Sequence, residues 1–245
     1  WIGVERLVDV IKKYIPDSRF YQASSSEMFG DAVETPQNEN TPFNPVSPYG
    51  EAKLRAHNAV KRAREDGLFA CSGILFNHES PQRGLEFVTR KFTDGISRIK
   101  LSLPQRVTGK NYVEIGNLEA KRDWGFAGDY VKAMWLMLKQ EKPDDYVIAT
   151  GENHSVREFL EQAAETLGIK INWEGENEKE VGYDQNNRKI IFIDKRLFRP
   201  VEVNNLVGDS SKARRVLRWK SEVSFTKLVK MMVLSDYERL KKIEK

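Results

Sequence analysis

A tyrosine and a lysine stand four residues apart directly after a proline, in the stretch Ser-Pro-Tyr-Gly-Glu-Ala-Lys at residues 47–53. Proline is favoured at the start of a helix, because the backbone donor that it lacks has no partner there. Residues four apart share one helix face, so Tyr49 and Lys53 are predicted to be neighbours. An ammonium group beside a phenol lowers the tyrosine pKa from about 10, which makes a base usable near neutral pH. An ordinary surface pair on a helix is the alternative that the spacing alone leaves open.

Polar residues that could act with this pair follow two apolar runs. The first run ends in Ser-Ser-Ser-Glu, which places Ser25 and Glu27 just after it, and the second is followed by Asn-His-Glu-Ser-Pro-Gln-Arg-Gly at 77–84. In open parallel sheets, the loops at the carboxyl ends of strands build the site. We therefore expect these side chains at one edge of a sheet.

The elements that would position these residues alternate along the chain. Apolar residues at helical spacing predict a helix over 2–14, and the proline-led helix continues to about residue 64. Buried strands are predicted at 19–24, 68–77 and 145–150. This order predicts an α/β protein with a Rossmann-like, doubly wound parallel sheet and a smaller α/β domain.

The second half of the sequence adds helices and one ambiguous region. Ser155 and Glu158 form a predicted capping box that opens a helix, and the apolar stretch 130–138 predicts a core helix. The polar stretch 173–190 predicts a loop or a hairpin. An amphipathic helix is predicted from about residue 224 to the end.

Composition limits the classes of function. The 245 residues include 40 basic and 36 acidic side chains, and this small excess suits an anionic small ligand such as a nucleotide. No basic stripe is interleaved with aromatic residues, so nucleic-acid binding is disfavoured. No apolar run reaches the length of about 18 residues that spans a bilayer, and the first residues lack a secretion-signal pattern.

Cysteine and histidine usage argues against metal binding. The single cysteine, Cys71, lies in an apolar run, which predicts a buried core thiol and a reducing, cytoplasmic location. One cysteine and three scattered histidines show no metal-ligand spacing, so no metal is expected. We expect His57 to face solvent and His154 to be structural.

A serine at a strand end followed by Tyr-x-x-x-Lys on the next helix resembles the short-chain dehydrogenase/reductase superfamily. The resemblance implies a catalytic role for each of the three residues. The Ser25 hydroxyl would hold the substrate oxygen and Tyr49 would remove its proton. Lys53 would keep the phenolate charged and reach the cofactor ribose.

Glu27 suggests a second proton-transfer step. Oxidation of a sugar at C4 acidifies the C5 proton, because the carbanion is delocalised as an enolate. A carboxylate can then take that proton while the C6 hydroxyl leaves, which is a 4,6-dehydration that returns the cofactor to its first state. Glu27 as a plain surface acid is the alternative.

Longer stretches in the same order resemble the GDP-mannose 4,6-dehydratase family over essentially the whole chain. The two stretches that discriminate this family from other nucleotide-sugar enzymes are Phe-Asn-His-Glu-Ser-Pro at 76–81 and Phe-Arg-Pro-Val-Glu-Val at 198–203. These two lie within the matching stretches 73–84 and 198–209, and the other matching stretches are 20–30, 47–53, 87–91, 122–138 and 146–159.

The resemblance implies a hydro-lyase of nucleotide-sugar metabolism with GDP-mannose as substrate and NADP as cofactor. Arginine suits a diphosphate because its fork can pair with two oxygens. The implied catalytic residues are Ser25, Glu27, Tyr49 and Lys53. The implied NADP contacts are Tyr49, Lys53, His78 and Arg83. The implied contacts to the GDP-sugar are Asn77, Lys91, Arg122, Arg199 and Glu202.

The sequence departs from the family pattern in three ways, one of which is that the stretch 96–117 is longer than its family counterpart. The family usually carries threonine where this chain has Ser25, and both residues supply a hydroxyl. None of the 16 glycines forms the glycine-rich turn that holds a cofactor pyrophosphate. We therefore expect the chain to correspond to the carboxyl-terminal two-thirds of a family member and, as it stands, to bind NADP poorly.

The resemblance also implies a domain division and a homo-oligomer, either a dimer or a tetramer. The predicted remainder of the NADP-binding domain is 1–76, to which 121–150 returns, and the predicted substrate domain is 77–120 with 151–245. One alternative function is another nucleotide-sugar epimerase, reductase or decarboxylase of the same superfamily. A different class of alternative is a cofactor-less binding or oligomerisation module.

Overall fold

The computed structural model describes residues 1–198 and 206–243, and the chain divides into two compact units. The first unit contains Trp1–His78, Arg122–Asn153 and the described residues up to 222 that follow position 205. The second unit contains Glu79–Lys121 together with residues 154–198 and 223–243. The segment 206–222 thus packs with the first unit, whereas the sequence-based division assigns it to the substrate domain.

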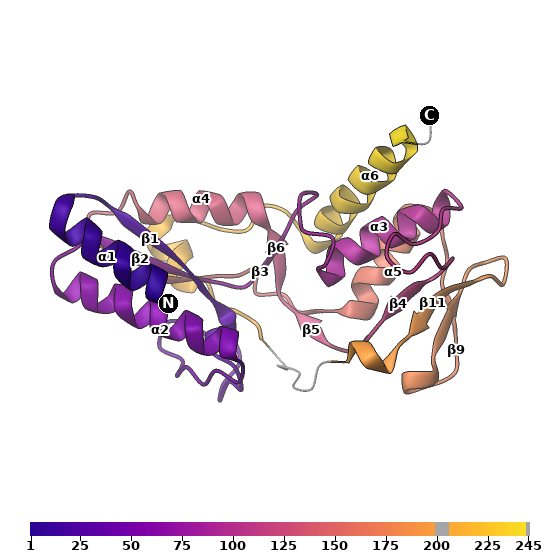
Figure 1. Ribbon diagram of the computed structural model, residues 1–245, viewed down its shortest axis with the longest axis horizontal. Helices are drawn as coiled ribbons and strands as arrows, with labels where there is room; N and C mark the ends of the chain where they lie inside the picture. The colour runs from indigo at the N-terminus through magenta and orange to yellow at the C-terminus, as the bar shows by residue number, and fades with distance from the viewer. Residues whose placement is uncertain (199–205, 244–245) are drawn as a thin grey trace. The chain divides into compact units, whose positions relative to one another are not determined.

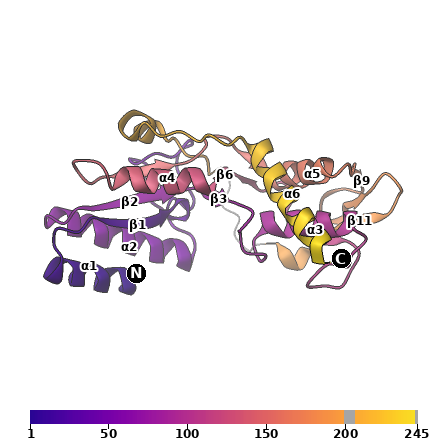
Figure 2. The same cartoon turned by 90° about the horizontal axis from the view of Figure 1, so that it is seen from above.

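The first unit is built on a parallel sheet of three strands. Its strands are β1 (Phe20–Ser25), β2 (Ala70–Leu75) and β7 (Asp145–Ile148), hydrogen-bonded in the order β1-β2-β7. Ser25 lies opposite Leu75, so β1 and β2 reach their carboxyl ends together. Helices α1 (Ile2–Tyr14) and α2 (Pro48–Glu65) cover one face of this sheet, and α4 (Ala127–Met137) covers the other (Figure 2).

Burial on both faces explains the apolar sequence of β2. Every residue of β2 is buried. Cys71 and Leu75 pack in the cluster that contains Tyr130 of α4, whereas Ile74 packs with Phe29 on the opposite face. A strand buried on both sides reads as a continuous apolar run rather than an alternating one. The predicted core position of Cys71 is confirmed, and burial raises the pKa of its thiol to about 12.

The second unit combines a mixed sheet with three helices. Its sheet runs in the order β4-β11-β10-β9, with β11 parallel to β4 and antiparallel to β10. Its helices are α3 (Val88–Lys100), α5 (Val156–Thr166) and α6 (Phe225–Ile243), and α3 packs against both others (Figure 1). The sheet strands are β4 (Val113–Ile115), β9 (Asn172–Glu174), β10 (Val181–Tyr183) and β11 (Lys189–Ile193).

Short elements complete the described chain. The remaining strands are β3 (Asn77–Glu79), β5 (Lys121–Arg122), β6 (Trp124–Phe126) and β8 (His154–Ser155). The short helices are η1 (Ser26–Met28), η2 (Asn177–Lys179), η3 (Lys195–Leu197) and η4 (Ala213–Leu217).

The structure confirms the predicted fold class and most predicted elements. The helix over 2–14, the helix opened by Pro48 and the three long strands are all present. The capping box is also present, since the Ser155 hydroxyl accepts from the Glu158 N–H and the Glu158 carboxylate accepts from the Ser155 N–H. The hairpin alternative for 173–190 is correct, because β10 and β11 pair across the Asp184 turn. Among the described helices, none is both long and apolar enough to cross a bilayer.

Candidate active site

Ser25 and Glu27 lie where β1 ends and η1 begins. Ser25 is the last residue of β1 and is buried, and its Oγ accepts a hydrogen bond of 3.3 Å from the Glu27 N–H. Glu27 is half-buried. In the described part of the chain, the Glu27 carboxylate makes no hydrogen bond or ion pair. A hydroxyl and an unpaired carboxylate therefore stand two residues apart at the carboxyl end of the sheet.

Tyr49 and Lys53 share one face at the start of α2, as their spacing predicts. Ser47 caps the helix, because its hydroxyl accepts from the Gly50 N–H at 3.0 Å, and Pro48 opens the first turn. The Lys53 Nζ lies 5.6 Å from the centre of the Tyr49 ring. Tyr49 is 56% exposed, and its hydroxyl has no hydrogen-bond partner among residues 1–198 and 206–243. This phenol is open to a ligand.

Helix α2 contacts the segment that carries Ser25 and Glu27. A side chain at Gly50 would bring its Cβ to 2.6 Å from the Glu27 carbonyl oxygen, so the close approach requires glycine at this position. Three residues further on, the Lys53 ammonium donates a 2.9 Å hydrogen bond to the Ala23 carbonyl. The structure thus brings together the three elements β1, η1 and α2, which carry all four predicted catalytic residues.

His57 is buried, so the expectation that it faces solvent is wrong. Its Nδ1 lies 3.2 Å from the Ser24 Oγ, and its Nε2 lies 3.7 Å from an Asp145 carboxylate oxygen. Burial lowers the His57 pKa, against the opposing effect of Asp145. His57 follows Lys53 by four residues, so the periodicity that pairs Lys53 with Tyr49 could also have placed His57 on the inner face of α2.

Asn77, His78 and Arg122 also belong to the first unit. Asn77 and His78 begin β3, immediately after β2, and both are half-buried. The His78 Nδ1 lies 2.9 Å from the Phe76 carbonyl, and its ring stacks on Tyr130 with centres 5.0 Å apart. The ring orientation of His78 is therefore fixed from two sides. Arg122 is half-buried and ends β5.

Arg83 lies in the second unit, where several groups hold it. Its Nε lies 3.2 Å from the buried Glu79 carboxylate, and its guanidinium lies 3.5 Å from the centre of the Phe87 ring. Burial raises the Glu79 pKa, although Arg83 and a hydrogen bond from Thr89 oppose this effect. The Arg83 main-chain carbonyl accepts a 2.7 Å hydrogen bond from Arg90.

Lys91 is half-buried and lines a pocket that lies wholly within the second unit. Burial lowers the Lys91 pKa, whereas the carboxylates of Glu114 and Asp194 act in the opposite direction. An ammonium beside apolar side chains and other charged groups suits a polar, anionic ligand. The other lining residues are Leu85, Asp94, Gln105, Arg106, Val107, Thr108, Val113 and Glu114.

Two predicted substrate contacts, Arg199 and Glu202, lie outside the described residues. Across residues 1–198 and 206–243, no group of three or more histidine, cysteine, aspartate or glutamate side chains could hold a metal ion.

Solved structures with the same architecture define the fold. The structure of dTDP-glucose 4,6-dehydratase from Bacillus anthracis matches with a TM-score of 0.78 and 19% identity, over 98% of this chain and 68% of that one. UDP-glucose 4-epimerase from Thermotoga maritima matches with a TM-score of 0.76 and 22% identity, over 98% and 69%. These likenesses establish the Rossmann-like α/β fold that such enzymes share.

The sequence defines the family within this fold. The family model for GDP-mannose 4,6 dehydratase matches residues 1–232, and the chain belongs to this family. GDP-mannose 4,6 dehydratase 2 of Arabidopsis thaliana is 52% identical over 98% of this chain, and the GDP-mannose 4,6 dehydratase of Homo sapiens is 49% identical over 98%. The chain spans 60% and 64%, respectively, of the length of these two relatives.

Proposed function

We propose that this chain carries the catalytic residues of a GDP-mannose 4,6-dehydratase that uses NADP. The reaction would convert GDP-mannose to GDP-4-keto-6-deoxymannose and release one water. The observation that carries the proposal is the Glu27 carboxylate beside Ser25, which is unpaired within the described residues. Its segment contacts the helix that bears Tyr49 and Lys53. A simple oxidation at one carbon has no use for this carboxylate.

The first proton transfer is assigned to Tyr49. As the phenolate, this exposed side chain takes the proton of the sugar C4 hydroxyl, while the Ser25 hydroxyl donates a hydrogen bond to the same oxygen. The nearby Lys53 ammonium stabilises the phenolate through its positive charge. NADP, when bound, would supply the oxidation at C4 and the later reduction at C6.

The residues present fit such a cofactor. Lys53 commits one hydrogen bond to Ala23 and has further donors for ribose hydroxyls. The Tyr49 hydroxyl, which has no partner among the described residues, adds another donor. His78 and Arg83 complete the proposed set, with Arg83 as a cation for phosphate. NADP rather than NAD is part of this proposal.

The second proton transfer is assigned to Glu27. With a ketone at C4, the carboxylate removes the C5 proton and then, as the acid, protonates the departing C6 hydroxyl. The C4=O bond is retained, C6 gains the hydride that C4 lost, and the Tyr49 hydroxyl returns to C5 the proton that it took in the first step. The sugar nucleotide therefore loses one water with no net oxidation.

The described members of the proposed contact set for the GDP-sugar are Asn77, Lys91 and Arg122. Lys91 lines the pocket of the second unit, and Asn77 and Arg122 come from the first. A guanidinium can pair with two diphosphate oxygens at once, which suits Arg122 to the diphosphate. Arg199 and Glu202 belong to the proposed set on sequence resemblance.

We also propose a cytoplasmic homo-oligomer. The single cysteine suits a reducing compartment. Apolar side chains on α1 that are more than half exposed, Leu7, Val10 and Tyr14, support self-association. Light scattering during size-exclusion chromatography separates monomer from dimer and tetramer, and cell fractionation tests the location.

The substitution Glu27→Gln tests the function, with product mass and cofactor absorbance as readouts. In the intact protein, Glu27→Gln should lower the rate of water loss by about 10²–10⁴-fold, because the base and acid of the second step is gone. Oxidation at C4 should persist, so reduced cofactor should accumulate. Tyr49→Phe should instead block the oxidation itself.

The matched control for Glu27→Gln is Glu51→Gln, which changes an exposed carboxylate on the first turn of α2, the helix that carries Tyr49. Its product and rate should equal those of the parent protein. Full dehydration by Glu27→Gln would rule out the assigned mechanism. A product of unchanged mass, or one that has lost carbon dioxide, would instead indicate an epimerase or a decarboxylase.

A further inference from the structure

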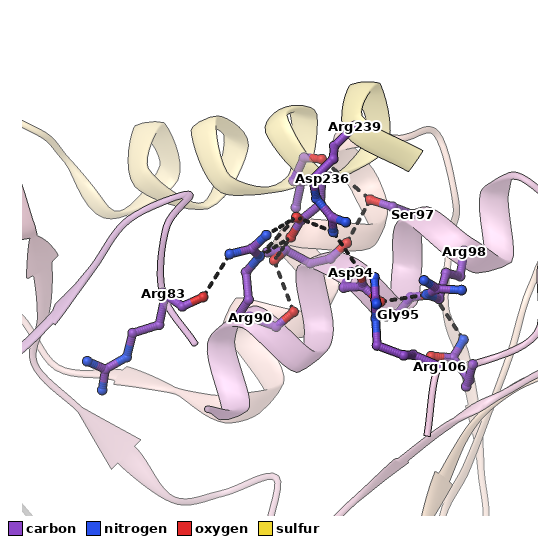
Figure 3. Close-up of polar contacts among 12 residues, drawn as sticks. Arg83, Arg90, Asp94, Gly95, Ser97, Arg98, Arg106, Asp236 and Arg239 are labelled. Carbon is purple, nitrogen blue, oxygen red and sulfur yellow. Dashed lines mark hydrogen bonds and ion pairs between the residues drawn. The ribbon is translucent and has the colours of Figure 1, made fainter. Parts of the chain in front are cut away.

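Five charged residues between α3 and α6 form a cluster in the second unit (Figure 3). We call it the arginine–aspartate cluster, and its members are Arg90, Asp94, Arg98, Asp236 and Arg239. The two carboxylates are almost fully buried, and the Arg90 and Arg98 side chains are 10% and 13% exposed. Charges this deep in a protein require close partners, because their transfer from water is costly.

Asp236 fixes the orientation of Arg90. The Arg90 Nε lies 2.9 Å and 2.7 Å from the two carboxylate oxygens, and its Nη2 lies 2.7 Å from one of them. Thr93 donates a further hydrogen bond of 2.7 Å to the same carboxylate. The remaining Nη1 points out of the cluster and donates to the Arg83 carbonyl at 2.7 Å (Figure 3).

Arg98 repeats this arrangement eight residues further along α3. Its Nε donates to an Asp94 carboxylate oxygen at 2.6 Å, and its Nη1 donates to the Pro104 carbonyl at 3.0 Å. Arg239 of α6 links the two halves, because its Nη2 donates to Asp94 at 2.8 Å and to Asp236 at 3.0 Å. Each arginine of α3 therefore joins a buried carboxylate to one loop carbonyl.

The two loops carry different parts of the proposed site. The carbonyl held by Arg90 belongs to Arg83, the proposed NADP contact. The carbonyl held by Arg98 precedes Gln105 and Arg106, which line the pocket that contains Lys91, a proposed contact to the GDP-sugar.

We propose that Arg90 and Arg98 are positioning residues with separate tasks. Arg90 sets the main chain at Arg83 and so the affinity for the cofactor. Arg98 sets the loop after Pro104 and so the affinity for the nucleotide sugar. The inference rests on the proposed function, since that function assigns Arg83 and Lys91 to the two ligands.

Replacement by lysine separates the tasks. Lysine keeps the charge but has no planar fork, so it cannot hold a carboxylate and a carbonyl in the same fixed geometry. Arg90→Lys should weaken NADP binding about tenfold, the equivalent of one lost hydrogen bond to a charged group, and should leave GDP-mannose binding unchanged. Arg98→Lys should do the reverse, so each variant is the matched control of the other.

Titration calorimetry on the intact protein measures the two dissociation constants, and steady-state kinetics measures the KM for each ligand and kcat. A positioning role predicts a change in one KM with kcat at saturation within about twofold of the parent protein, because only binding is altered. General damage to the fold would lower kcat and would also lower the affinity for both ligands.

A double-mutant cycle tests whether Arg90 acts through Arg83. Arg83→Ala should remove the NADP contact, and Arg90→Lys should then have no further effect on NADP binding. If Arg90→Lys fails to fold, Thr93→Val offers a milder change, because it removes one donor to Asp236 and keeps both arginines. Thr93→Val should weaken NADP binding alone.

Two outcomes overturn the inference. The first is that either lysine variant binds both ligands as tightly as the parent protein. The second is that both variants bind NADP and GDP-mannose more weakly by the same factor. A parent protein that binds neither NADP nor GDP-mannose would contradict the proposed function, and the inference with it. A parent protein that dehydrates GDP-mannose while the variants match it contradicts the inference alone.

Discussion

In the first unit, helix α2 is held against the end of β1 by contacts to uncharged groups of that segment. Lys53 donates to a carbonyl, Gly50 packs on a main-chain oxygen, and His57 meets the Ser24 hydroxyl. In the second unit, α3 is held against α6 by contacts between opposite charges, with Asp236 completely buried among arginines. At these two places the units fix a helix by different chemistry, whereas further along α2 an ion pair joins Arg64 to Asp145 of β7.

This difference fits what each contact must leave available. Neutral contacts on α2 leave the Glu27 carboxylate and the Tyr49 hydroxyl without partners in the part of the chain that the structure describes, and both are needed for proton transfer in the proposed reaction. In the charged contacts on α3, the carboxylates of Asp94 and Asp236 are paired with arginines. The remaining N–H groups of Arg90 and Arg98 donate to loop carbonyls. We infer that the first arrangement suits chemistry and the second suits the shaping of a binding surface.

The largest expected effect comes from breaking the charged contact. Asp236→Ala leaves Arg90 buried without its carboxylate, and loss of one partner of a buried ion pair costs about 3–5 kcal/mol of unfolding free energy. Urea unfolding followed by circular dichroism measures this loss. Asp236→Leu combined with Arg90→Met should recover part of it, because apolar residues of similar volume replace buried ion pairs well.

A smaller loss is expected from breaking the neutral contact. Ser24→Ala removes the hydroxyl beside the His57 Nδ1, and a buried polar atom left without a partner costs about 1–3 kcal/mol. The matched control is Ser72→Ala in β2, since the Ser72 hydroxyl is completely buried and makes no hydrogen bond within the described chain. Ser72→Ala should leave the unfolding free energy unchanged or raise it.

Equal losses for Ser24→Ala and Asp236→Ala would remove the distinction between the two units. Ser72→Ala could also lower the unfolding free energy as much as Ser24→Ala does. The volume of the Ser24 hydroxyl, and not its contact with His57, would then account for the loss.

The sequence predicts local features of this molecule better than long-range ones. The start of α2, the capping box at Ser155 and the pairing of Tyr49 with Lys53 depend on residues within one helical turn, so spacing alone identifies them. The strands β4 and β9 have three residues each, too few for a periodic signal, and no prediction named them.

The contacts that join α3 to α6 are invisible to spacing arguments. Arg90 and Asp236 are separated by 146 positions, and nothing in their local sequence marks them as partners. The placement of His57 was available from its spacing to Lys53, but its partners Ser24 and Asp145 lie on two different strands. Pairing across the fold has to come from the structure.

The smallest expected effect is a pH dependence that belongs to the first unit alone. Burial lowers the His57 pKa in the folded protein below the value of about 6.5 of the unfolded chain. The unfolded chain therefore binds a proton first as the pH falls. Stability is fully present above pH 6.5 and is lost as the pH falls through the window down to the folded pKa.

Comparison of the parent protein with His57→Asn isolates this effect. Asparagine offers an oxygen near the position of Nδ1 and does not titrate, while the charged groups that face His57, namely Asp145, Arg64 and Lys61, stay the same. Between pH 7 and pH 6 the parent should lose less than about 1 kcal/mol relative to the variant, because at most one proton is taken up. Urea unfolding at each pH gives the difference. An equal pH dependence in both proteins would mean that His57 titrates in the folded state as it does in water, and its burial against Ser24 would then have no electrostatic consequence.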